Sequence, residues 1–189
     1  MPMQPGISVK EELTPPRGKF HLLSLYADLP ASVRARWAAG TIAKLVGPQW
    51  HTTSEMWKID SLNVSAPIRE MITNDAANAD VVIIAASSLA HGEPMLVQWL
   101  NSLEACKVKR PVTGLLVGLL GDEEATTVEL GGVVKPLILC AQHMGWNFIW
   151  HWMGEEAMRD SEWLTANVET LLASKSAASD EMLFVERLL

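Results

Sequence analysis

The feature that most constrains this sequence is an uninterrupted apolar run, VVIIAA, at Val81–Ala86. A run of this length, rich in β-branched residues, is typical of a strand buried on both faces at the centre of a parallel sheet. A small polar loop follows, and then Pro94, a residue that suits the first turn of a helix. The segment therefore predicts a strand, a loop and a helix, in that order.

Other apolar segments alternate with helix-like segments along the chain. We expect further strands at Phe20–Tyr26, Trp50–Leu62 (at a sheet edge), Val112–Leu120 and Trp146–Trp152. We expect helices at Ser32–Leu45, Ile68–Ala77, Pro94–Leu103, Val128–Met144 and Glu162–Ala173. Strands that alternate with helices imply a parallel sheet with helices on both faces and right-handed crossovers. The predicted fold class is therefore α/β, in three layers.

The composition fits one globular domain, because hydrophobic residues make up 49% of the chain and charged residues 20%. We expect a flexible N-terminal arm at residues 1–19 and a domain at 20–175. A C-terminal tail at 176–189 would be free to dock on a partner subunit. No apolar run approaches the roughly 20 residues of a membrane span, so no membrane association is expected. The formal net charge of −7 likewise disfavours nucleic acid as a partner.

The cysteines and histidines do not indicate a metal site. Cys106 and Cys140 lack metal-ligand spacing, and we expect free buried thiols, which favours the reducing cytoplasm. The histidines are scattered along the chain. The glycines of the stretch Gly114–Gly121 fall within a predicted strand, where close backbone packing explains them better than nucleotide binding.

Three segments carry a resemblance to the NADPH-dependent FMN reductase family: Ala79–Ile84, Gly92–Pro94 and Gln98–Leu103. They resemble the Ala-Asp strand, loop and Pro-started helix of that family. The resemblance implies a flavodoxin-like fold, with a doubly wound five-stranded parallel sheet in the order 2-1-3-4-5. It also implies FMN as cofactor, NAD(P)H as electron donor, and a homodimer or higher homo-oligomer.

The loops differ from the pattern of the family. Its first loop, Gly-Ser-x-Arg-x-x-Ser, cradles the FMN phosphate, whereas Leu25–Ser32 reads LYADLPAS, with no glycine and with an aspartate in the middle. Its third loop carries an aromatic residue against the flavin ring, whereas Ser87–His91 has none. Acidic residues also occur in the predicted carboxyl-end loops, namely Asp28, Glu93, Asp122, Glu123, Glu124 and Glu155. They either repel a phosphate or cap helix starts.

For this strand order, a small-molecule pocket is expected beyond the carboxyl ends of the first and third strands. Either Asp28 or Ser32 would cap the following helix, and Ser32 and Arg34 would contact the phosphate. Ser87, Ser88, Leu89 and His91 would flank the ring. Gly121 and Asp122 would close the far side. No catalytic residue is predicted.

Two functions follow from these observations. The first is a flavoprotein of the FMN reductase type, in which the redox chemistry belongs to the cofactor. The second is a non-catalytic flavodoxin-like scaffold or partner-binding module that has lost flavin binding. Its contact surface would be the tail and the late tryptophans Trp146, Trp150, Trp152 and Trp163. These tryptophans either pack the core and a self-association surface or form a stacking platform for a flat ligand.

Overall fold

The five strands of the structure form one parallel sheet in the order β2-β1-β3-β4-β5, as predicted. In this computed structural model, the residues described are 18–87, 93–105, 113–121, 127–152, 158 and 160–186, without the side chains of 93, 127–132 and 179–186. The strands are β1 (Gly18–Tyr26), β2 (Trp50–Lys58), β3 (Val81–Ala86), β4 (Leu115–Leu120) and β5 (Asn147–Trp152). The prediction of an edge position for the second strand is confirmed.

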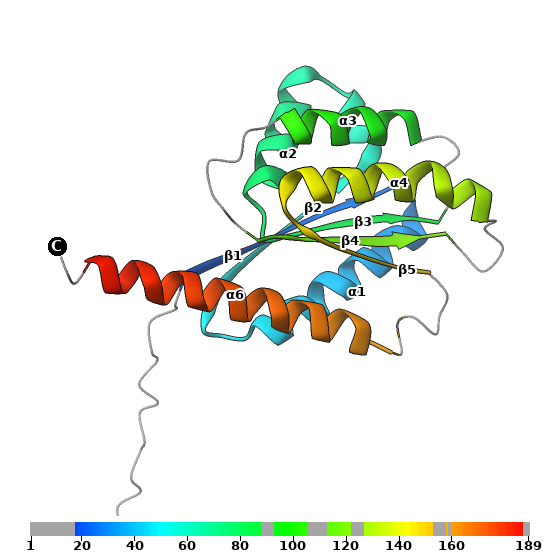
Figure 1. Ribbon diagram of the computed structural model, residues 1–189. Coiled ribbons are helices and arrows are strands. Elements are labelled where there is room, and N and C mark those ends of the chain that lie inside the picture. Colours follow the sequence, from blue (N-terminus) through cyan, green and yellow to red (C-terminus); the bar gives the residue numbers. More distant parts are fainter. Residues whose placement is uncertain are drawn as a thin grey trace, which may run out of the picture.

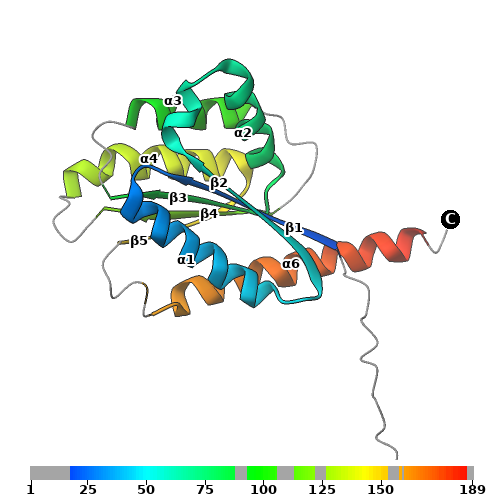
Figure 2. The same cartoon turned by 180° about the vertical axis from the view of Figure 1, so that it is seen from behind.

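Helices cover both faces of the sheet, which gives the three layers expected (Figure 1). One face carries α2 (Ala66–Asn78), α3 (Glu93–Ala105) and α4 (Thr127–Met144). The other face carries α1 (Leu29–Val46) and α6 (Glu162–Glu186), as Figure 2 shows from behind. A short 3-10 helix, η1 (Ile59–Asn63), follows β2. Within the described ranges, no helix combines the length and apolarity that crossing a membrane requires.

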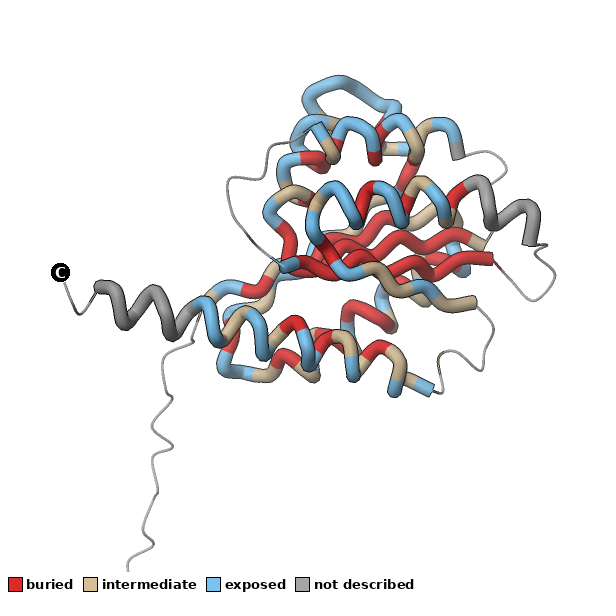
Figure 3. Tube along the Cα trace, viewed as in Figure 1, coloured by how far each residue is buried: buried red, intermediate tan, exposed pale blue. Residues whose placement is uncertain are grey.

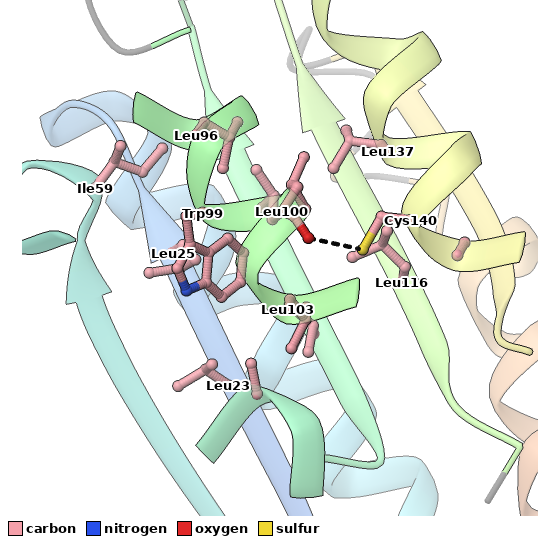
Figure 4. Packing of buried hydrophobic residues seen from close by; sticks show 14 of the residues in the cluster. Leu23, Leu25, Ile59, Leu96, Trp99, Leu100, Leu103, Leu116, Leu137 and Cys140 are labelled. Atoms are coloured by element: carbon pink, nitrogen blue, oxygen red, sulfur yellow. Dashed lines mark hydrogen bonds between the residues drawn. The ribbon is translucent and has the colours of Figure 1, made fainter. Parts of the chain in front are cut away.

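The core lies on both sides of the central strands. Every residue of β3 and β4 is buried, which explains why their sequences are apolar without alternation (Figure 3). On the side of α2, α3 and α4, Trp99 is the largest of the fully buried side chains (Figure 4). Its indole N–H donates to the Thr73 hydroxyl at 3.0 Å. This bond satisfies a polar group that burial alone would penalise.

The glycines of the predicted fourth strand are explained by close packing, as expected. A Cβ atom on Gly114 would lie 2.5 Å from Nε1 of Trp146, and one on Gly118 would lie 3.1 Å from Cβ of Trp150. A side chain at Gly114 would therefore require the indole of Trp146 to move. These two glycines are packing positions in β4 and directly before it.

Several boundaries differ from the prediction. β1 begins at Gly18, inside the predicted arm, because residues 18 and 19 already pair with β2. β2 ends at Lys58, since the buried Ile59 and Leu62 belong to the 3-10 turn and not to the strand. β4 begins only at Leu115. The last helix continues to residue 186, with no glycine or proline to end it. The predicted boundary at 175/176 therefore falls inside α6.

Candidate functional site

The carboxyl ends of β1 and β3 meet through one side chain, that of Asp28. Asp28 is the N-cap of α1, and its Oδ1 accepts the backbone N–H of Ala31 at 2.8 Å. Oδ1 also accepts the hydroxyl of Ser87 at 3.0 Å, and Oδ2 accepts the backbone N–H of Ser87 at 3.0 Å. The carboxylate thus caps a helix and ties the first loop to the third. Of the two capping candidates, Asp28 is the one used.

Backbone bonds hold the same edge together. The N–H of Ala27 donates to the carbonyl of Ala85 at 2.9 Å, and the N–H of Gly121 donates to the carbonyl of Ala86 at 2.8 Å. Gly121 is buried and has a φ of 78°, a conformation that suits glycine because it lacks a Cβ. The starts of the first, third and fourth loops therefore lie together, as the strand order predicts.

Two other predicted residues lie on α1. The Ser32 hydroxyl donates to the carbonyl of Leu29 at 2.7 Å, so it bonds within its own helix. Nη1 of Arg34 is buried and has no hydrogen-bond partner among the residues described. Leu29 is 78% exposed, which leaves the start of α1 apolar and open at its surface. The remaining predicted site residues, Ser88, Leu89, His91 and Asp122, lie outside the described residues.

The described part of this edge does not fit a flavin phosphate. A phosphate at the start of a helix needs free N–H donors, and the Asp28 carboxylate already accepts those of Ala31 and Ser87. The carboxylate also brings a negative charge to the position of the phosphate. Two like unit charges about 4 Å apart repel by about 4 kcal/mol at the effective dielectric of a protein surface, and by less if water lies between them. The Asp28 carboxylate therefore takes, at the start of α1, the position that a bound phosphate would need.

The late tryptophans divide between core and surface. Trp146 is 7% exposed and belongs to the core, whereas Trp150 is 39% exposed on the edge strand β5. The rings of Trp150 and Trp152 lie 5.8 Å apart, and the ring of His151 stacks on that of Trp163 at 5.0 Å. The predicted packing role is confirmed for Trp146, and Trp152 is partly buried against the same core cluster. Trp150 is the exposed aromatic residue of β5.

Burial displaces the pKa values of two ionisable groups. Burial raises the pKa of the Cys140 thiol to about 12, with a smaller contribution from the charge of Glu104. Cys140 is the free buried thiol that the sequence predicts, whereas Cys106 lies outside the described residues. Burial also raises the pKa of Asp75, and the neighbouring carboxylate of Glu55 adds to the shift. Neither group lies at the carboxyl edge.

Sequence analysis did not single out Asp80, a carboxylate at the amino ends of the strands that has two partners. Asp80 is 4% exposed, its Oδ2 accepts the backbone N–H of His21 at 2.8 Å, and its Oδ1 pairs with Nζ of Lys175. The sequence could have indicated this, because Asp80 stands directly before the fully apolar strand Val81–Ala86. A carboxylate buried at such a position needs hydrogen-bond or ion-pair partners. Its partner from α6 is distant in sequence, so spacing alone did not reveal the pair.

The fold is that of flavodoxins, as a comparison with solved structures shows. The chain is similar to the flavodoxin, WrbA-like protein from Agrobacterium tumefaciens, with a TM-score of 0.51 and 12% identity. The match covers 85% of this chain and 98% of that one. No protein-family model matches the chain, and no curated protein matches it by sequence. The protein is therefore a flavodoxin-like α/β domain, and its similarity to that structure is one of fold alone.

Proposed function

We propose that this protein is a flavodoxin-like binding module that does not hold a flavin phosphate at its first loop. The observation that carries the proposal is the Asp28 carboxylate, which accepts the Ala31 N–H and both donors of Ser87. In this arrangement the loops after β1 and β3 support each other without a ligand. The fold then serves as a scaffold, a role that doubly wound sheets fill as readily as catalysis.

The surface that we assign to partner binding is the outer edge of β5, and the occupant is a second copy of the chain. β5 pairs only with β4 among the described strands, so its other edge presents backbone groups that can pair with another strand. Trp150 is 39% exposed on this strand and contacts Trp152. An exposed aromatic residue on an unpaired edge suits a twofold interface.

A second candidate is the FMN-dependent oxidoreductase predicted from sequence, with NAD(P)H as donor and a cytoplasmic location. Two observations favour it: the likeness in fold to a flavodoxin, and the buried Nη1 of Arg34, which has no partner among the residues described. An unpartnered guanidinium nitrogen favours an anion nearby. We rank this candidate second because the Asp28 carboxylate already accepts the N–H groups of Ala31 and Ser87 and brings a negative charge to the start of α1.

A fluorescence titration separates the two functions. FMN is titrated with the purified protein, and an absorption spectrum of the untreated protein is recorded. The binding module predicts a spectrum without flavin bands and FMN fluorescence that keeps its full intensity. Saturable quenching of FMN, or a yellow protein, would refute the module and support the oxidoreductase.

The assembly is tested separately by light scattering on the full chain. We expect twice the chain mass for the unaltered protein and a monomer for Trp150→Lys. The matched control is Val64→Lys, which alters a residue that is 68% exposed and distant from β5 in the sheet order, and which should keep the dimer. A monomeric unaltered protein would remove the proposed interface.

A further inference from the structure

A pocket of about 380 Å³ lies at the amino edge of the sheet, opposite the edge where flavodoxin-like folds bind ligands. Its lining comes from the starts of β1 and β2, the end of α2, the residues before β3 and β5, and α6. The lining residues are Lys19, His21, His51, Thr53, Ala77, Asn78, Ala79, Asp80, Trp146 and Lys175. The volume falls within the range of small-molecule sites and is far larger than a single water requires.

Parallel pairing places the basic side chains of this pocket side by side. Lys19 pairs with His51, and His21 pairs with Thr53, in the register of β1 and β2. Side chains two residues apart on a strand lie on the same face, so these four share the face covered by α2. Nδ1 of His21 and the Thr53 hydroxyl are hydrogen-bonded at 2.8 Å, which orients both side chains. Two strands thus present one polar surface to the pocket.

The Asp80 carboxylate does not dominate the charge of the pocket, because structural bonds engage it. One oxygen accepts the backbone N–H of His21 and the other pairs with Lys175. Nζ of Lys175 also lies 5.5 Å from the ring centre of Phe20 and 5.4 Å from that of Trp50. Figure 1 shows how α6, from which this lysine comes, passes the amino end of β1. The pair closes one side of the pocket.

The charge balance of the lining favours an anion. Two lysines and one aspartate give a formal charge of +1 with both histidines neutral, in a chain whose formal net charge is −7. The acidic Asp75 and Glu55 lie on the neighbouring α2 and β2 and do not line the pocket. A positive site in an acidic protein is a local feature and not a consequence of overall composition.

We propose that this pocket binds a small organic anion. Its carboxylate or phosphate group would lie against Lys19 and His51, and its apolar part against Ala77, Ala79 and Trp146. The aliphatic and indole surfaces supply the apolar contact that an inorganic ion would not use. The site is separate from the Asp28 edge, so this proposal goes beyond the proposed function, and the FMN titration does not decide it.

The test is an NMR titration of the full chain with benzoate, phenyl phosphate and the neutral benzyl alcohol, followed through the backbone amides. We expect at least one anion to cause saturable shifts at amides lining the pocket, with benzyl alcohol at least about tenfold weaker. The two anions distinguish a carboxylate site from a phosphate site, and preference for either supports the proposal. The double variant Lys19→Gln, His51→Gln should weaken binding by about fivefold to tenfold.

Lys44→Gln is the matched control, because it removes an exposed lysine of α1 that does not line the pocket. This variant should bind the probe as the unaltered protein does. The proposal is overturned if neither anion shifts the pocket amides at up to about 10 mM. It is equally overturned if benzyl alcohol binds as well as the anions, or if the double variant binds as well as Lys44→Gln.

Discussion

Replacing Asp28 with alanine tests how far the first and third loops depend on one carboxylate. The substitution removes the N-cap of α1, which is typically worth about 1 kcal/mol. It also removes both bonds to Ser87, and hydrogen bonds to a charged group contribute about 1.5–3 kcal/mol each when well formed. Because Asp28 is only half-buried and its three bonds are not additive, we expect a total loss of about 2–3 kcal/mol.

The loss is measured by urea unfolding and by thermal melting of the full chain. For a domain of this size it corresponds to a fall of about 5–10 °C in Tm. Asp60→Ala is the control, since its ion pair with Lys58 joins side chains that are 63% and 50% exposed and should contribute below about 0.5 kcal/mol. A loss for Asp28→Ala no greater than that of the control would refute the structural role of the carboxylate. In a double-mutant cycle with Ser87→Ala, a coupling energy near zero would refute the tie between the loops.

Three further predictions concern two buried side chains, Trp99 and Cys140, and the carboxylate pair of Asp75 and Glu55. Trp99→Phe removes the buried indole N–H that donates to Thr73 and should cost about 1–3 kcal/mol in urea unfolding; an unchanged midpoint would contradict the role given to this bond and to the packing of the indole. The raised pKa of Cys140 and its burial predict negligible alkylation by iodoacetamide in the folded protein and rapid alkylation in denaturant, followed by mass spectrometry; equal rates would contradict this. Because the pKa of Asp75 is raised, the folded protein holds this proton more tightly than the unfolded chain does. The resulting gain in folding stability is present below the ordinary pKa of 3.8 and is lost as the pH rises through the raised pKa. Glu55→Gln should therefore stabilise the protein near neutral pH by less than about 1 kcal/mol and give no gain in acid, and a gain that grows on acidification would reverse this reasoning.

The sheet could be predicted well because the apolar composition of its central strands indicates that both of their faces are buried. Val81–Ala86 has no polar residue, and a strand with two buried faces requires that composition. Gly114 and Gly118 were correctly interpreted as packing positions, although only Gly118 lies within the strand. The end of the last helix could not be placed, because no glycine or proline in its sequence marks a stop.

The candidate site was predicted less completely, for a physical reason. The sequence left open whether Asp28 repels a ligand or caps a helix, because both uses favour an acidic residue at the same place. The bonds to Ser87 decide this point, and they join residues 59 positions apart. The amino-edge pocket was missed for the same reason: the pairing of Lys19 with His51 and of Asp80 with Lys175 depends on strand register and helix placement.

The comparison of FMN with riboflavin tests the central claim most directly, because the two ligands differ by the phosphate. Their dissociation constants are measured by calorimetry for the unaltered protein and for Asp28→Asn, which keeps an acceptor for the cap and removes the charge. If the Asp28 carboxylate takes the place of a bound anion at the start of α1, FMN shows no advantage over riboflavin in the unaltered protein. FMN binding that is tighter than riboflavin binding by about tenfold or more would contradict the account.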